Sequence, residues 1–253
     1  MKRIPFPIAL LVVVIAAGFI GWGLTHILSQ SSHAERKATV SNSLEGSPPP
    51  LPRGWSYIVV ARTHRLVFRR RPRGHIRVKL ANPTPVGSKL TLLVRKPGSR
   101  WIQTYLPMRP NGANAWVARS TVRLLTTSYA LNVHLRSHKL LVFRDGRVLR
   151  RFSIGVGQSV TPTPTGTYFI TELLKQPDPN GLYGPYACGL SAYSGVLQHF
   201  GLGGNGQVGI HGTNDPGGIG TDVSHGCIRL RNSDIRWLVK RLPLGAPVRI
   251  SHD

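Results

Sequence analysis

From residue 55 onward, short apolar runs separated by turn-forming residues recur along this chain, and they leave little room there for long helices. Runs of about four to eight residues in which apolar and polar side chains alternate are typical of β-strands with one buried face. The first runs of this kind lie at residues 55–61, 75–81, 89–96, 101–107 and 115–119. Five short strands over about 70 residues, with Gly- and Pro-rich turns between them, predict a small β-barrel.

A second group of runs begins near Thr126 and continues to the end of the chain. Asp145 and Gly146 lie between two apolar runs within residues 139–157 and predict a tight hairpin turn. Further strands are predicted for ALNVHL (130–135), GTYFITEL (166–173), QVGIHG (207–212), HGCIRL (225–230) and APVRI (246–250). One amphipathic helix is expected near Asn232, which we assign as its N-cap. The chain is therefore predicted to be mostly β: the small barrel, then a β-sandwich or barrel with one or two short helices.

The N-terminus combines basic residues with a long apolar segment. After Lys2 and Arg3, an apolar run covers residues 8–28, which as a helix would span about 30 Å, the hydrocarbon core of a bilayer. We expect an uncleaved signal anchor over residues 1–28, with a cleaved signal peptide as the alternative. The basic residues before the run predict a single-pass cell-membrane protein whose remaining chain lies outside the cytoplasm. Residues 29–52 are Ser-rich and contain a triple proline, which predicts a flexible linker.

Positive charge is concentrated after this linker. The sequence has 33 basic and 9 acidic residues, for a net charge of +24, yet residues 46–144 hold 19 basic residues and no acidic ones. Four arginines fall in one predicted loop: Arg69, Arg70, Arg71 and Arg73. The module at residues 53–125 is therefore expected either to bind an anionic partner or to present a solvated basic surface.

The most specific chemical signal lies near the end of the chain. There His211 ends one predicted strand, and Ser224, His225, Gly226 and Cys227 follow after a loop of turn formers. A cysteine attacks as the thiolate, so it needs a base or a cationic partner close by. The backbone N–H groups around Gly226 are expected to stabilise an oxyanion. This pattern predicts a cysteine-nucleophile site.

These residues resemble the signature of the YkuD-type L,D-transpeptidases of bacterial cell walls, a histidine followed at a distance by S/T-H-G-C. Two further segments match in the expected order: T-P-T-G-T at residues 163–167, before a predicted strand, and YGPYACGLSAYS at residues 183–194. The resemblance implies a YkuD-type β-sandwich or barrel for the catalytic domain, which we place at residues 126–253.

The resemblance also assigns roles to single residues. Cys227 is the nucleophile, His211 is its general base, and the carbonyl group of Gly212 orients that histidine. His225 and Gly226 support the thiol and the oxyanion region. The chain departs from many members at Arg229, where they carry Asn, and this change bears on how the donor's carboxylate is bound.

The implied reaction transfers an acyl group between peptidoglycan stem peptides and uses no cofactor. Cys227 attacks the stem carbonyl at the third position, D-alanine leaves, and an amine from a neighbouring stem takes over the acyl group in a 3→3 cross-link. Ser224 and Arg229 are expected to contact the substrate, with Arg231 as the alternative partner for a stem carboxylate. Three tyrosines are assigned to the same surface, with core packing as the alternative: Tyr183, Tyr186 and Tyr193. Water as the acceptor would give a carboxypeptidase, and an inactive site would leave a wall-binding scaffold protein.

Cys188 and the two histidines leave other chemistries to weigh. Cys188 lies in an apolar segment and is expected to be a buried free thiol, with a disulfide to Cys227 as an alternative. A Cys2His2 zinc set with His211 and His225 is disfavoured because zinc sites usually bring closely paired ligands, so we expect no metal. No G-x-S-x-G motif supports a serine hydrolase.

The basic module at residues 53–125 resembles the bacterial SH3-like modules that accompany wall enzymes. The resemblance rests on the strand pattern and on P-N-G-x-x-x-W-V at residues 110–117. Its expected partners are anionic wall polymers or lipid headgroups. Nucleic acid is not expected, because it does not occur in the compartment that the family implies.

Overall fold

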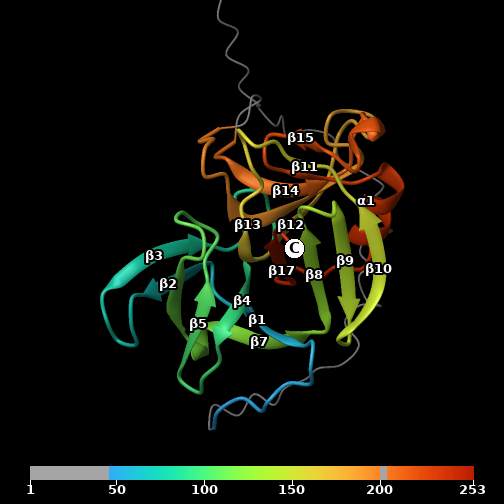
Figure 1. Cartoon of the computed structure of the whole chain (residues 1–253). Helices are drawn as coiled ribbons and strands as arrows, with labels where there is room; N and C mark the ends of the chain where they lie inside the picture. Colours follow the sequence, from blue (N-terminus) through green and yellow to red (C-terminus); the bar gives the residue numbers. More distant parts are fainter. Residues whose placement is uncertain (1–45, 200–203) are drawn as a thin grey trace, which may run out of the picture. The chain divides into compact units, whose positions relative to one another are not determined.

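The computed structural model describes residues 46–199 and 204–253, and Figure 1 shows the arrangement of their strands. Most of the regular structure in these residues is β-strand. The α-helix found among them, α1 (Asn232–Val239), has eight residues. The prediction of a mostly β fold is therefore confirmed.

The first sheet has seven antiparallel strands in the order β3-β2-β6-β5-β4-β1-β7. The strands are β1 (Ser56–Ala61), β2 (Arg65–Arg69), β3 (Ile76–Ala81), β4 (Thr91–Lys96), β5 (Trp101–Tyr105), β6 (Asn114–Ala118) and β7 (Val122–Thr127), with a short 3-10 helix, η2 (Arg119–Thr121), before the last. Fully buried apolar side chains such as Leu66, Phe68, Leu92 and Ile102 form its core.

Two of these strands, β2 and β7, were not predicted. In β2 the buried Leu66 and Phe68 are enclosed by Arg65 and Arg69, so the apolar run is too short to stand out. The strand β7 crosses the expected domain boundary at residues 125 and 126. The SH3-like character of this module stays a prediction.

The second sheet has eight strands in the order β10-β9-β8-β17-β12-β13-β14-β16. They are β8 (Tyr129–His134), β9 (Lys139–Arg144), β10 (Arg147–Ser153), β12 (Gly166–Lys175), β13 (Tyr186–Tyr193), β14 (Gln207–His211), β16 (Ile228–Arg229) and β17 (Pro247–Ser251). A separate parallel pair joins β11 (Val156–Gly157) to β15 (Asp222–Ser224), and a 3-10 helix, η3 (Pro216–Gly218), precedes β15. Most pairings are antiparallel, but β14 and β16 run parallel, as do β8 and β17.

Local sequence explains the hairpin between β9 and β10. Asp145 and Gly146 both have positive φ, 53° and 74°, as a two-residue turn between twisted strands requires. Leu140 and Val142 alternate with less buried residues along β9 and point into the core. This part of the prediction is confirmed.

The helix α1 packs Ile235 and Leu238 into the core of the second sheet. Its N-cap position is Arg231, and no side chain caps the helix there. Assigning Asn232 as the N-cap was therefore wrong. The side chain of Asn232 binds another loop of the chain instead.

Packing and hydrogen bonds connect the two sheets. Phe169 of β12 is fully buried within the apolar core of the first sheet. Arg109, in the loop between β5 and β6, donates three hydrogen bonds of 2.7–3.2 Å to backbone carbonyls of the segment after β13: Ser194, Leu197 and Asn205. A charged side chain that binds several carbonyls holds the residues that carry them.

The predicted anchor at residues 1–28 lies outside the described residues, as does most of the predicted linker. Among the residues that the structure does describe, no helix has the length and apolar character needed to cross a bilayer. This finding does not support the prediction of a single-pass membrane protein, and that prediction is withdrawn.

Candidate active site

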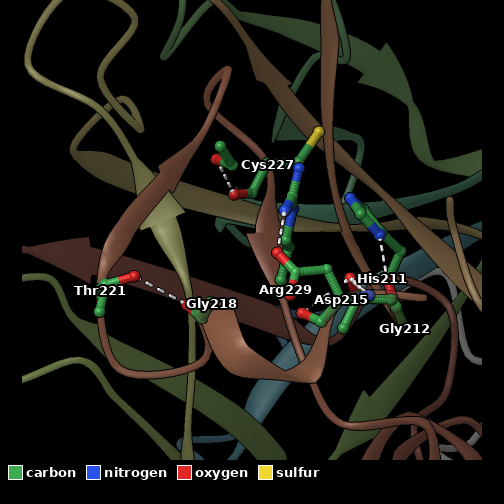
Figure 2. A network of polar contacts seen from close by, with 9 residues as sticks. His211, Gly212, Asp215, Gly218, Thr221, Cys227 and Arg229 are labelled. Atoms are coloured by element: carbon green, nitrogen blue, oxygen red, sulfur yellow. Dashed lines mark hydrogen bonds and ion pairs between the residues drawn. The ribbon is translucent and has the colours of Figure 1, made fainter.

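His211 and Arg229 are neighbours where β14 pairs with β16. Side chains at paired positions lie on the same face of a sheet, as do side chains two residues apart along the chain. Cys227 comes two residues before Arg229, so it lies on this face as well. The paired residues Ile210 and Ile228 are fully buried on the other face. Figure 2 shows the sulfur of Cys227 gathered with His211 and Arg229 at this end of the strands.

His211 is buried, and the backbone sets the state of its ring. Its Nδ1–H donates to the carbonyl oxygen of Gly212 at 2.5 Å, so Nε2 of the neutral ring carries a lone pair. Burial lowers the pKa of His211 from 6.5 to about 4; the Gly212 carbonyl raises it, and the charge of Arg229 lowers it further. His211 is therefore neutral near pH 7, the state in which it can accept a proton.

The thiol of Cys227 is half-buried and is subject to opposing influences. Burial raises its pKa above the usual 9.0, whereas a hydrogen bond from the backbone N–H of Gly209 and the charge of Arg229 lower the pKa. Both lowering influences stabilise the anion. The site thus favours the thiol at rest and stabilises the thiolate once a base removes the proton.

Ser224 holds the turn that carries the nucleophile. Its hydroxyl donates to the carbonyl of Cys227 at 2.5 Å and accepts from the N–H of Gly226 at 3.0 Å. Gly226 has φ of 118°, which other residues rarely adopt. Because Ser224 occupies the N–H of Gly226, the donors left for an oxyanion are the N–H groups of His225 and Cys227, for which the described residues supply no partner. The side chain of His225 is exposed.

The Thr- and Pro-rich block before β12 packs against this turn. Thr161 Oγ1 and the backbone N–H of Gln158 both donate to the carbonyl of Ser224, at 3.3 and 2.9 Å. Thr163 Oγ1 accepts from the N–H of Gly157 at 2.9 Å. A Cβ added to Gly157 would come within 2.5 Å of the carbonyl oxygen of Thr161, so only glycine fits there. The segment that leads into the T-P-T-G-T motif therefore supports the turn that carries Ser224 and Cys227.

Arg229 provides a positive charge beside both reactive side chains. Two backbone hydrogen bonds to Gly155, of 2.8 and 3.0 Å, hold its strand. Its Nη1 lies 4.0 Å from Oδ2 of Asp215, and its buried Nε has no hydrogen-bond partner within the described residues. A guanidinium with an unused buried donor is suited to binding a carboxylate.

Known proteins are similar in sequence to the part of the chain that contains this site. The family model for the YkuD-type L,D-transpeptidase catalytic domain matches residues 128–250. The candidate L,D-transpeptidase YkuD of Bacillus licheniformis is 36% identical over 126 residues, which cover 50% of this chain and 67% of that protein. The Bacillus subtilis protein of that name is also 36% identical over 126 residues, 50% of this chain and 68% of its own. The chain belongs to the YkuD family of L,D-transpeptidases.

The family acts on peptidoglycan stem peptides, and this chain is an L,D-transpeptidase enzyme. Among solved structures, an L,D-transpeptidase from Mycobacterium smegmatis is 20% identical over 57% of this chain and 76% of that chain, with a TM-score of 0.39.

Tyr183 lies beside His211. Its ring meets that of His211 edge to face, with centroids 4.9 Å apart and an angle of 74°. Tyr186 was assigned to the same surface, but it packs partly buried against the apolar core. Because Ala187 is the residue paired with His211, Tyr186 lies on the opposite face of β13.

The structure does not bring Tyr193 into the site. It lies at the far end of β13, where its hydroxyl donates to the carbonyl of Pro107 at 2.9 Å. Its backbone exchanges two hydrogen bonds with the side chain of Asn111, of 2.8 and 2.9 Å. Tyr193 thus joins the two sheets and lies away from His211 and Cys227.

Cys188 is fully buried as a free thiol, as expected. It pairs with Ile210, on the core face of the sheet, and burial raises its pKa to about 12. Since Cys227 lies on the other face, the alternative of a disulfide between them is not supported. Residues 46–199 and 204–253 contain no group of three or more His, Cys, Asp or Glu side chains placed to hold a metal ion.

Three contributors to the site were not predicted: Gly209, Asp215 and Asn232. Gly209 acts through its backbone N–H, which leaves no side-chain signal in the sequence. Asp215 lies in a loop of turn formers, where aspartate is common for local reasons. Asn232 begins a helix, where its amide is usually read as a cap.

Proposed function

We propose that this L,D-transpeptidase forms 3→3 peptidoglycan cross-links through a thioester on Cys227. The thiolate adds to the carbonyl carbon of the third residue of a tetrapeptide stem. The C–N bond to the terminal D-alanine then breaks, D-alanine leaves as the amine, and the acyl group stays on sulfur. An amine of a neighbouring stem attacks the thioester, forms the new amide bond and releases the thiol.

His211 moves the proton in both halves of this reaction. Its neutral ring accepts the thiol proton at Nε2 and passes it to the departing amine, because the imidazolium formed is a stronger acid than the leaving ammonium. In the second half it takes a proton from the attacking amine. The observation that carries the proposal is the buried, neutral His211 on the same sheet face as Cys227.

Backbone donors, a charged side chain and an aromatic ring complete the proposed reaction site. The N–H groups of Cys227 and His225 stabilise the oxyanion formed at each addition, and the fixed turn at Gly226 keeps them aligned. Arg229, whose guanidinium lies 4.0 Å from the carboxylate of Asp215, binds a carboxylate of the donor stem. The partly buried ring of Tyr183 forms one wall for the peptide.

Intact-mass analysis of the full chain with a tetrapeptide stem tests this proposal. We expect an adduct equal to the stem minus D-alanine, mapping to Cys227 and missing in Cys227→Ala. With an amine acceptor the product is a cross-linked dimer. A free tripeptide formed even with excess acceptor would favour the carboxypeptidase reaction, and no adduct on Cys227 would contradict the acyl-transfer proposal.

The basic hairpin between β2 and β3 favours a second function, binding to phosphodiester polymers of the wall. Three arginines, with His75 and Ile76, line a shallow hollow there: Arg69, Arg71 and Arg73. Arg69 Nη1 also donates to the carbonyl of Gly74 at 2.7 Å, which holds one guanidinium against the turn. With no acidic residue between positions 46 and 144, nothing nearby in the sequence neutralises this charge.

Binding to purified wall polymer at several salt concentrations tests this second function. We expect the triple variant Arg69→Gln, Arg71→Gln, Arg73→Gln to bind more weakly and with a smaller salt dependence than the natural protein. Equal loss of binding to anionic vesicles would point to lipid headgroups. Unchanged binding to both would leave the charge as a solvated surface.

A further inference from the structure

Asn232 takes part in the site through an unexpected contact. It is the first residue of α1, yet it does not cap the helix. Instead its Oδ1 accepts a hydrogen bond from the backbone N–H of Thr213 at 2.9 Å. The side chain therefore holds the loop that directly follows His211, the last residue of β14.

One peptide group connects this bond to His211. The N–H of Thr213 and the C=O of Gly212 belong to the same planar unit. That carbonyl accepts the Nδ1–H of His211 at 2.5 Å. Holding the N–H end of a planar group fixes the direction of its C=O end, and a hydrogen bond donated by the N–H strengthens the one accepted by the C=O.

The surroundings of the Asn232 amide leave room for little else. A Cβ added to Gly184 or to Gly212 would come within 2.3 Å of Asn232 Oδ1. Gly184 also has φ of 59°, and it directly follows Tyr183, whose ring contacts His211. The two glycines let their two segments approach the amide of Asn232 closely.

We propose that Asn232 is a positioning residue for His211. Its amide oxygen holds the peptide group between Gly212 and Thr213, so that the proton stays on Nδ1 of His211 and Nε2 remains free to accept the proton of Cys227. The role of His211 as a base rests on the proposed function, but the placing of the proton on its ring does not.

Alkylation of Cys227 by iodoacetamide in the full-length protein measures this effect without a peptide substrate. We expect Asn232→Ala to slow alkylation at pH 7 by about 10- to 100-fold, the usual loss when a group that orients a reactive side chain is removed. Asn232→Asp keeps an acceptor oxygen and should recover most of the rate. Ser233→Ala, at the exposed next residue, is the matched control and should react as the natural protein does.

Nitrogen NMR of the His211 ring separates positioning from general destabilisation. We expect the Nδ1–H form in the natural protein and a mixture of both neutral forms in Asn232→Ala. An unchanged ring together with an unchanged alkylation rate would overturn the proposal.

If the alanine variant does not fold, the Asp variant decides the question. Its added negative charge should raise the pH at which His211 takes up a proton, while the groups that face the ring, Arg229, Cys227 and Tyr183, stay the same. A titration identical to that of the natural protein would overturn the proposal. If the ring responds as expected but no cross-link forms, the acyl-transfer proposal fails and the positioning role stands.

Discussion

Cys188 and Cys227 lie on opposite faces of the same sheet and meet opposite conditions. Burial raises the pKa of both thiols, and for Cys188 nothing opposes it, so the pKa reaches about 12. At Cys227 the N–H of Gly209 and the charge of Arg229 act against burial. The difference shows that desolvation alone keeps a thiol protonated and inert. On the other face, nearby dipoles and charges stabilise the thiolate form of Cys227.

Replacing each cysteine gives the largest expected contrast. Cys227→Ala should lower the rate of stem-peptide acylation by about 10⁴-fold or more, because no other group takes over as the nucleophile. Cys188→Ala should leave the rate near that of the natural protein and lower the free energy of unfolding by about 1–2 kcal/mol through lost packing. Acylation kinetics and urea unfolding measure both. A Cys188 variant that folds but does not acylate would break the contrast.

Replacing His211, which lies on the same face of the sheet as Cys227, should have the next largest effect. His211→Gln should slow acylation by about 10²- to 10⁴-fold because Cys227 loses its base. In the natural protein, activity should stay level as the pH falls towards 5 and then drop as His211 takes up a proton near its pKa of about 4. The exposed His64→Gln is the control. A loss of activity centred near pH 6.5 instead would mean that burial does not hold the ring neutral.

The same histidine should affect stability. In the unfolded chain His211 takes up a proton near pH 6.5, whereas the folded chain resists protonation until about pH 4. Stability is therefore lost as the pH falls through this window, by about 3 kcal/mol from this group. Urea unfolding at pH 7 and pH 4 should show a smaller drop in His211→Gln than in the natural protein. Equal drops in both would contradict this assignment.

Arg229 gives the smallest expected effect. Its charge lowers the pKa of both His211 and Cys227, so Arg229→Gln should raise both and move the acid limb of activity to higher pH. We expect acylation to slow by about 10-fold, the usual worth of one partly buried charge contact. Arg231→Gln, at an exposed neighbouring residue, is the control for net charge. A shift of the same size in Arg231→Gln would show a long-range field effect.

The sequence predicts those parts of the fold that depend on near neighbours. The turn at Asp145 and Gly146 follows from two adjacent residues, and the strands around it from their alternating side chains. The short strand β2 was missed because its buried Leu66 and Phe68 are enclosed by arginines, which leaves no apolar run long enough to stand out. Family motifs brought out Cys227 and His211, but no local pattern distinguishes a tyrosine beside the base from one in the core.

Asn232 and Tyr193 show the same limit at the level of the site. The first was read from its own helix, yet its partner lies 19 residues earlier in the sequence. Tyr193 belongs to a segment that matches the family, residues 183–194, yet its hydroxyl donates to the carbonyl of Pro107, 86 residues away. Contacts over such separations become visible only when the chain is folded.

The hydrogen bonds of Arg109 and Asn111 to the segment around Tyr193 have a consequence for how such enzymes diversify. Phe169 and these bonds tie the catalytic sheet to its neighbour, so the two halves are not interchangeable parts. A gene fusion that gave this catalytic sheet a different companion would leave an aromatic side chain in water and several carbonyls without donors. A fusion protein that keeps this sheet and Cys227 therefore also has to keep the contacts that join the two sheets.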